Sequence, residues 1–250
     1  MLTFVSSGNE DILLAVDNLR NDLALQEIRR MRRLLDCWHT NNRTQIECST
    51  FKRDVIQYYN RTGKTDRRGL IISARCMVSD RLCDYADLCP AHLVKHKSPE
   101  LMSLYGLNPA DVDSPRNGIL VLKEIELAFD HKDVCFLCAV TTTGYLHLRV
   151  LNPTLRTKRI YPSSPNDQRT FDDVDNSVLR CPKRVYPYRR ILSMHAKLSF
   201  SRALSRGWIQ DSAVLDTYFN ISQAGLLEPE CMRTLTWKQV NYAEIEKTLT

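Results

Sequence analysis

The sequence predicts an α+β fold in which short central strands lie between helical segments at the two ends of the chain. Three observations predict it. Apolar residues recur every three or four positions from Asn9 to about Asn60, which is the period of an amphipathic helix. The middle of the chain holds short apolar runs separated by turn residues. A second helical pattern, Tyr188 to Arg206, ends at Gly207, a residue that often terminates helices.

Composition limits the class of protein. The 250 residues are 43% hydrophobic, which suffices for a real core. The net charge of +6 suits nucleic acid but does not require it. Nine cysteines show no framework spacing, so we expect reduced thiols. Met1 to Val16 lacks the pattern of a signal peptide, and no run approaches the roughly 18 apolar residues of a membrane span. We therefore expect a soluble intracellular protein, in the nucleus or cytoplasm, without a membrane partner.

The elements of the first half are expected in the following order. Gln45 to Tyr59 continues the helical pattern as a second helix. Asn60 to Arg68 is polar and basic and predicts a linker. Leu70 to Val78 predicts a short strand. Leu82 to Pro115 has turn residues and few periodic runs, so we expect a long ordered loop with one short helix over Pro99 to Tyr105.

The second half begins with the apolar strand Gly118 to Leu122, which leads into a short amphipathic helix, Lys123 to His131. Val134 to Val140 and Tyr145 to Leu151 predict a hairpin about Thr143-Gly144. The segment from Asn152 is rich in Pro, Ser, Asp and Asn and predicts a mobile loop. The expected division is a helical segment 1–68, a central domain 69–151, a mobile loop 152–187 and a helical extension 188–250 that packs on the central domain.

The central domain carries the candidate chemistry. Metal-dependent phosphodiester hydrolysis needs a base to activate water, hard ligands for a divalent cation, and a group that holds the base in place. His92 lies at the end of an extended stretch, where a neutral imidazole can take a proton near pH 7. Asn117 lies at a turn, where its amide can hold neighbouring backbone. Glu126 and Asp130 are four apart on the expected helix, so both carboxylates share one face and suit Mg²⁺ or Mn²⁺ better than zinc.

Four stretches in this order resemble the HNH endonuclease family, in particular HNH-domain proteins of fungi: Cys76-Met-Val-Ser, Ala91-His-Leu-Val, Arg116-Asn-Gly-Ile-Leu-Val and Ile125-Glu-Leu-Ala-Phe-Asp. The resemblance implies a central ββα-metal core with additional strands. It also implies His92 as general base, Asn117 as the brace of its loop, and Glu126 with Asp130 as ligands of Mg²⁺ or Mn²⁺. We then expect the His92 imidazole to face the helix that carries both carboxylates.

Two positions depart from the family pattern. Glu126 stands where the family has His, and Ala91 stands before the base, where the family often has Asp, Glu or His as a metal ligand. Two functions therefore stay open. One is a metal-dependent endonuclease that hydrolyses DNA. The other is a catalytically inactive HNH-like module that binds nucleic acid, or binds a protein partner through its N-terminal helices.

Basic and cysteine residues add further candidates. Arg116, Lys183, Arg184, Arg189 and Arg190 are candidate nucleic-acid contacts, and Tyr186 and Tyr188 lie among the last four for stacking on bases. DNA is the expected partner, with RNA left open. The basic stretch could equally be the charged start of a helix packed on the core. The CxxC pair Cys135 and Cys138 could belong to a structural zinc site, but residues three apart on a strand face opposite sides, which favours buried thiols.

Overall fold

A computed structural model describes residues 45–138 and 145–210, which form a mixed α and β structure. Three two-stranded antiparallel sheets carry its strands. The elements in chain order are α2 (Gln45–Tyr58), β1 (Ser73–Arg75), β2 (Leu82–Asp84), β3 (Leu88–His92), β4 (Gly118–Leu122), α3 (Lys123–Asp130), β5 (Val134–Cys138), β6 (Leu146–Val150), α4 (Phe171–Val174) and α5 (Arg189–Ser205).

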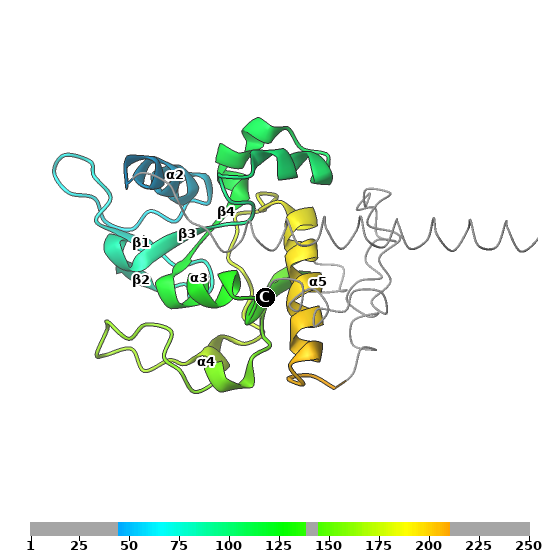
Figure 1. Cartoon of the computed structure of the whole chain (residues 1–250). Helices are drawn as coiled ribbons and strands as arrows, with labels where there is room; N and C mark the ends of the chain where they lie inside the picture. The colour runs from blue at the N-terminus through cyan, green and yellow to red at the C-terminus, as the bar shows by residue number, and fades with distance from the viewer. Residues whose placement is uncertain (1–44, 139–144, 211–250) are drawn as a thin grey trace, which may run out of the picture.

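The β3–β4 pair lies at the centre, with α2 on one side and α3 on the other (Figure 1). The register pairs Leu88 with Leu122 and His92 with Gly118. β3, β4 and α3 therefore form two antiparallel strands followed directly by a helix. β4 is buried along its whole length, which explains its continuous apolar sequence.

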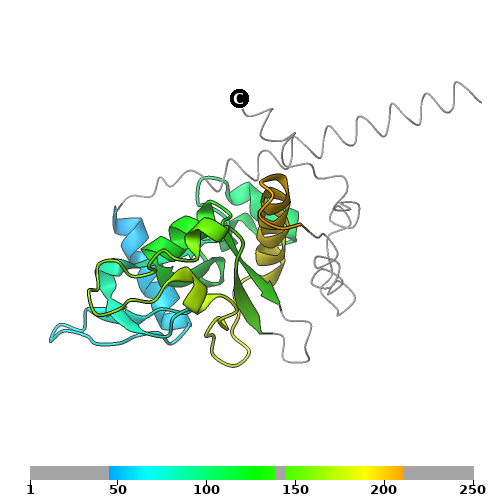
Figure 2. The same ribbon diagram turned by 90° about the horizontal axis from the view of Figure 1, so that it is seen from below.

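The β5–β6 hairpin packs against α5, and Figure 2 shows the two strands beside that helix. α5 ends at Ser205, and Gly207 follows with a positive φ of 67°. This confirms the predicted helix and the glycine after its end, because glycine adopts that backbone conformation without steric cost. The predicted hairpin strands are confirmed, whereas the turn about Thr143-Gly144 lies outside the described residues.

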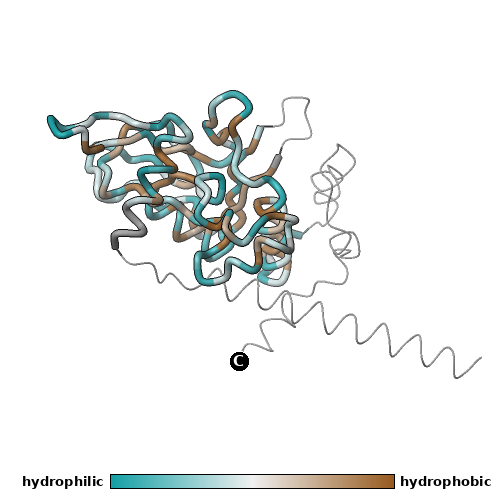
Figure 3. Tube along the Cα trace, turned by 90° about the horizontal axis from the view of Figure 1, so that it is seen from above, coloured by the Kyte–Doolittle hydropathy of each residue, from teal (hydrophilic) through white to brown (hydrophobic). Residues whose placement is uncertain are grey.

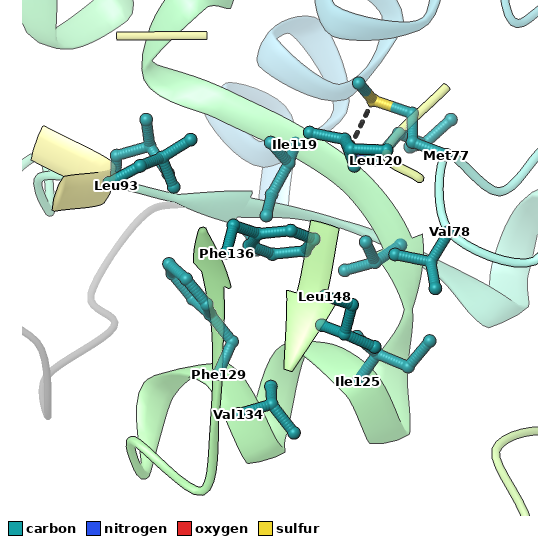
Figure 4. Close-up of a cluster of buried hydrophobic side chains, with 14 of the residues drawn as sticks. Met77, Val78, Leu93, Ile119, Leu120, Ile125, Phe129, Val134, Phe136 and Leu148 are labelled. Atoms are coloured by element: carbon teal, nitrogen blue, oxygen red, sulfur yellow. Dashed lines mark hydrogen bonds between the residues drawn. The ribbon is translucent and has the colours of Figure 1, made fainter. Parts of the chain in front are cut away.

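The main core joins these layers. Apolar stretches run through the middle of the molecule, and the outer loops are hydrophilic (Figure 3). Side chains from β4, α3, β5 and β6 meet in one cluster, where Phe129 and Phe136 pack with ring centroids 5.8 Å apart (Figure 4). The backbone N–H of Leu120 donates to the Met77 sulfur at 3.2 Å in the same cluster. The central strands are thereby fixed to the chain before them and after them.

Three expectations about irregular segments need correction. The expected linker folds back on β1, since Thr62 bridges Ala74 and Thr65 bridges Ile71. The expected strand from Leu70 is regular only over Ser73–Arg75. The expected loop from Leu82 contains β2 and β3 before the 3₁₀ turn Pro99–Tyr105, which lies where a short helix is predicted.

The segment after Asn152 also holds more structure than its composition predicts. It contains α4, whose first residue Phe171 is buried. Arg156 forms ion pairs with Asp172 and Asp175. Arg180 N donates to Met77 O at 2.8 Å, which ties the segment to the core. The segment predicted as a mobile loop over 152–187 therefore contains one short helix, α4. Among the described residues, no helix combines the length and the apolar character needed to cross a membrane.

Candidate functional site at the central hairpin

Asn117 holds the chain that follows His92. It is fully buried immediately before β4. Its Oδ1 accepts from Val94 N at 2.9 Å, and its Nδ2 donates to Val94 O at 2.7 Å and Val112 O at 2.9 Å. Its backbone O accepts from Leu93 N at 2.9 Å. One side chain thus satisfies three backbone groups and fixes the residues after β3.

His92 is the last residue of β3, but its ring lies against α2. The side chain is 5% exposed, and its ring stacks on Phe51 with centroids 4.0 Å apart and an interplanar angle of 16°. Its cross-strand partner is Gly118, where an added Cβ would lie 2.8 Å from Phe51 and 2.9 Å from Val55. Directly opposed residues share a face of a sheet. The face that carries His92 therefore packs on α2.

The carboxylates lie with the other face. Glu126 and Cys89 lie close enough for each to shift the pKa of the other, and Cys89 is three residues from His92 on β3. Residues an odd number apart on a strand point to opposite faces, so Cys89 faces α3 while His92 faces α2. The expectation that the imidazole faces the helix of Glu126 and Asp130 is therefore wrong in this structure. The physical reason is α2, whose apolar side covers the His92 face.

Asp130 has a lysine partner. Its Oδ2 lies 2.6 Å from Lys95 Nζ, and the two side chains are 17% and 3% exposed. Burial raises the pKa of both Asp130 and Glu126, and the neighbouring Asp130 raises the pKa of Glu126 further. Lys95 opposes these shifts at both carboxylates. The ammonium of Lys95 is thus the cation that balances this face of α3.

These groups do not fit a divalent metal as they are arranged. Mg²⁺ and Mn²⁺ need several hard oxygen ligands, and one of the two carboxylates already binds Lys95. Burial raises the pKa of the nearby Cys89 thiol to about 12, which keeps it protonated. In the parts of the chain that the structure describes, no three His, Cys, Asp or Glu side chains are grouped to bind a metal.

Two of the predicted basic residues, Arg116 and Arg189, contact tyrosine rings. Arg116 Nε donates to Tyr186 O at 3.3 Å, and its guanidinium lies 4.6 Å from the Tyr188 ring centroid. The Arg189 guanidinium lies 4.2 Å from the Tyr186 ring centroid. We call Arg116, Tyr186 and Arg189 the basic–aromatic surface; Tyr188, which Arg116 covers, is buried as part of the core. Folding brings its two parts together across about seventy residues of sequence.

The other basic candidates differ in their surroundings. Lys183 and Arg184 are exposed on the chain that leads into this surface. Arg190 instead donates to Tyr105 O at 3.0 Å, so it anchors α5 to the 3₁₀ turn Pro99–Tyr105. His96 is exposed, and its Nε2 lies 3.5 Å from Asp113 Oδ1.

Three residues near the site were not predicted. Phe51 covers His92, and Lys95 holds Asp130. Lys52 Nζ donates to Leu88 O at 2.6 Å and to Tyr85 O, which ties α2 to the start of β3. Lysine is rarely buried, so no local pattern would have placed Lys52 or Lys95 inside. The apolar face of the Gln45–Tyr59 helix indicated burial but not its partner.

A comparison with known protein families gives one match, which lies in the central part of the chain. Residues 76–137 match the family model of HNH endonucleases. The match begins just after β1 and ends within β5, so it includes His92, Asn117 and α3. It indicates nuclease-type function for this part of the chain in general terms. No curated protein and no solved structure matches the chain. A special likeness to fungal members of the family stays a prediction.

Proposed function

We propose that this chain binds nucleic acid, with DNA as the ligand, through the basic–aromatic surface beside an HNH-type unit. The observation that carries the proposal is that exposed Arg116 meets partly exposed Tyr186, whose ring also contacts the Arg189 guanidinium. Guanidinium groups pair with phosphate oxygens, and an accessible tyrosine ring such as that of Tyr186 stacks on a base. Arg116 precedes Asn117 directly, so bound nucleic acid would lie at the end of the central hairpin.

Binding is better supported than hydrolysis for two reasons. His92, the candidate base, packs under Phe51 and faces α2, whereas the carboxylates lie with α3. A base must reach the water whose proton it takes. In addition, Lys95 engages Asp130, one of the two predicted metal ligands. The inactive HNH-like module is therefore the function that the geometry favours.

Fluorescence anisotropy with labelled duplex DNA tests the proposal, with an RNA duplex of equal length as a second ligand. We expect the double variant Arg116→Ala/Arg189→Ala to bind DNA at least about tenfold more weakly. The slope of log affinity against log salt should fall by about one for each phosphate that the variant no longer neutralises.

The matched control is Arg67→Ala, which removes an exposed arginine between α2 and β1 and should bind as the parent does. Equal affinity of the double variant and the parent would refute the proposed surface. Tighter binding of the RNA duplex than of the DNA duplex would reassign the ligand.

A second candidate function is metal-dependent hydrolysis of DNA, with His92 as base, Asn117 as its brace and Glu126 and Asp130 as ligands of Mg²⁺ or Mn²⁺. The family match over 76–137 favours it, as does the way Asn117 holds the chain after His92. A plasmid-nicking assay with either ion decides between the two functions. Cleavage by the parent that is abolished in His92→Gln and kept in His96→Ala, the exposed histidine four residues on, would establish the nuclease and overturn the binding-only proposal.

A further inference from the structure

The carboxylates of α3 need a positive charge beside them. Glu126 and Asp130 are one turn apart, and both are only partly exposed. Two negative charges in a poorly hydrated place repel each other and are costly unless a cation pairs with them. In HNH-type nucleases that cation is a divalent metal. Here the structure offers a side chain instead.

Lys95 reaches this position because the chain before it is held rigidly. Asn117 bonds both the N–H and the C=O of Val94, the residue before Lys95. Ser98 N donates to Lys95 O at 3.0 Å on the other side. The backbone on both sides of Lys95 is thus fixed, which holds the base of its side chain within reach of Asp130.

Among the charged groups around Glu126 and Asp130, Lys95 is the main counter-charge. The cations that act on Asp130 are Lys95, Lys132 and His131, and Lys95 has the largest effect. Lys95 also acts on Glu126. The Lys95 ammonium therefore binds Asp130 directly and acts on Glu126 through its charge.

We propose that the Lys95 ammonium permanently replaces the divalent metal of the HNH-type unit, and that removal of Lys95 opens a divalent-cation site at Glu126 and Asp130. The proposal rests on the HNH-type unit in the proposed function and explains how that unit stays folded without metal. It also gives a reason for the carboxylate at position 126. A carboxylate there attracts the ammonium that Asp130 holds, whereas the histidine usual in the family would not.

The test uses MnCl₂ alone with the full chain and no nucleic acid. Isothermal titration with Mn²⁺ up to about 1 mM should detect no stoichiometric binding to the parent. Lys95→Met should bind one Mn²⁺ with a dissociation constant at least about tenfold below that concentration. The triple variant Lys95→Met/Glu126→Gln/Asp130→Asn should lack the site again. Lys97→Met, which removes an exposed lysine two residues away, is the matched control and should behave as the parent does. Absence of Mn²⁺ binding by folded Lys95→Met would refute the proposal.

A second measurement does not depend on the folding of that variant. The thermal midpoint of the parent should be the same in Mn²⁺ and in EDTA. A rise in Mn²⁺ that Asp130→Asn abolishes would show that metal displaces Lys95, and would overturn the proposal. Neither measurement involves the basic–aromatic surface, so failure of DNA binding and failure of the Lys95 proposal are separate outcomes.

Discussion

The two faces of the β3–β4 hairpin are stabilised by different physics. The face toward α2 is a steric fit, in which the Phe51 ring stacks on His92 and leaves no room for a side chain at Gly118. The face toward α3 is a charge balance, in which Lys95 pairs with Asp130 beside Glu126. One strand pair thus packs its His92 side on a helix and sets the carboxylates of its other side against an internal lysine.

The largest expected effect comes from removing the Phe51 ring, which packs between α2 and His92. Phe51→Ala should destabilise the protein by about 3–5 kcal/mol, because it removes a buried ring and leaves a cavity beside His92. Urea unfolding measures the difference. Tyr58→Ala, at the exposed end of the same helix and itself 36% exposed, should cost far less. Equal destabilisation by the two variants would mean that the steric fit is not what holds this face.

Asn117 joins the two faces, since it braces the chain between His92 and Lys95. Asn117→Ala should cost about 3 kcal/mol because Val94 N–H, Val94 C=O and Val112 C=O lose a buried partner. Asn117→Asp keeps the acceptor for Val94 N–H and removes both donated bonds. It therefore separates the contribution of the accepted bond from that of the two donated bonds. Unfolding free energies within about 0.5 kcal/mol of the parent, the size of a neutral surface change, would contradict the bracing role.

Gly118 tests the close fit on the α2 face directly. Gly118→Ala should cost about 1–3 kcal/mol, because the new methyl group would lie under 3.0 Å from Phe51 and Val55. In the Phe51→Ala background the same change should cost less, since the ring it would meet is gone. A double-mutant cycle on unfolding free energies measures this coupling, and additive costs would argue against the close approach.

The smallest expected effect concerns pH at the end of α3. Buried His195 donates from Nε2 to Phe129 O over 2.7 Å, and its ring stacks on the Phe129 ring with centroids 3.7 Å apart. Burial lowers the pKa of His195 well below its usual 6.5. The unfolded chain therefore takes up a proton near pH 6.5 that the folded chain does not, so stability is full above this pH and falls below it, by at most about 1.4 kcal/mol per pH unit.

His195→Gln should remove this part of the pH dependence. The measurement is the difference in unfolding free energy between parent and variant from pH 7 to pH 5, which cancels the titration of groups that both share. A difference that stays constant over this range would show that His195 does not titrate as its burial requires.

Short-range patterns predicted the helices and the apolar strands well. Gln45–Tyr58, Gly118–Leu122 and Lys123–Asp130 agree with expectation to within a residue, because helical period and continuous apolar runs are local properties. β3 was predicted only as an extended stretch within a loop. Pro90 lies inside it, and proline argues against a central strand, but β3 pairs on one side only and tolerates it.

The sequence by itself determined the helices, the apolar strands and the position of His92 at the end of an extended stretch, since these follow from local residue types and spacing. Only the tertiary structure decided which way the site faces. The cover over His92 comes from Phe51, forty-one residues earlier, and the partner of Asp130 comes from Lys95, thirty-five residues earlier. Contacts at such separations depend on how whole elements pack, and no local pattern encodes them.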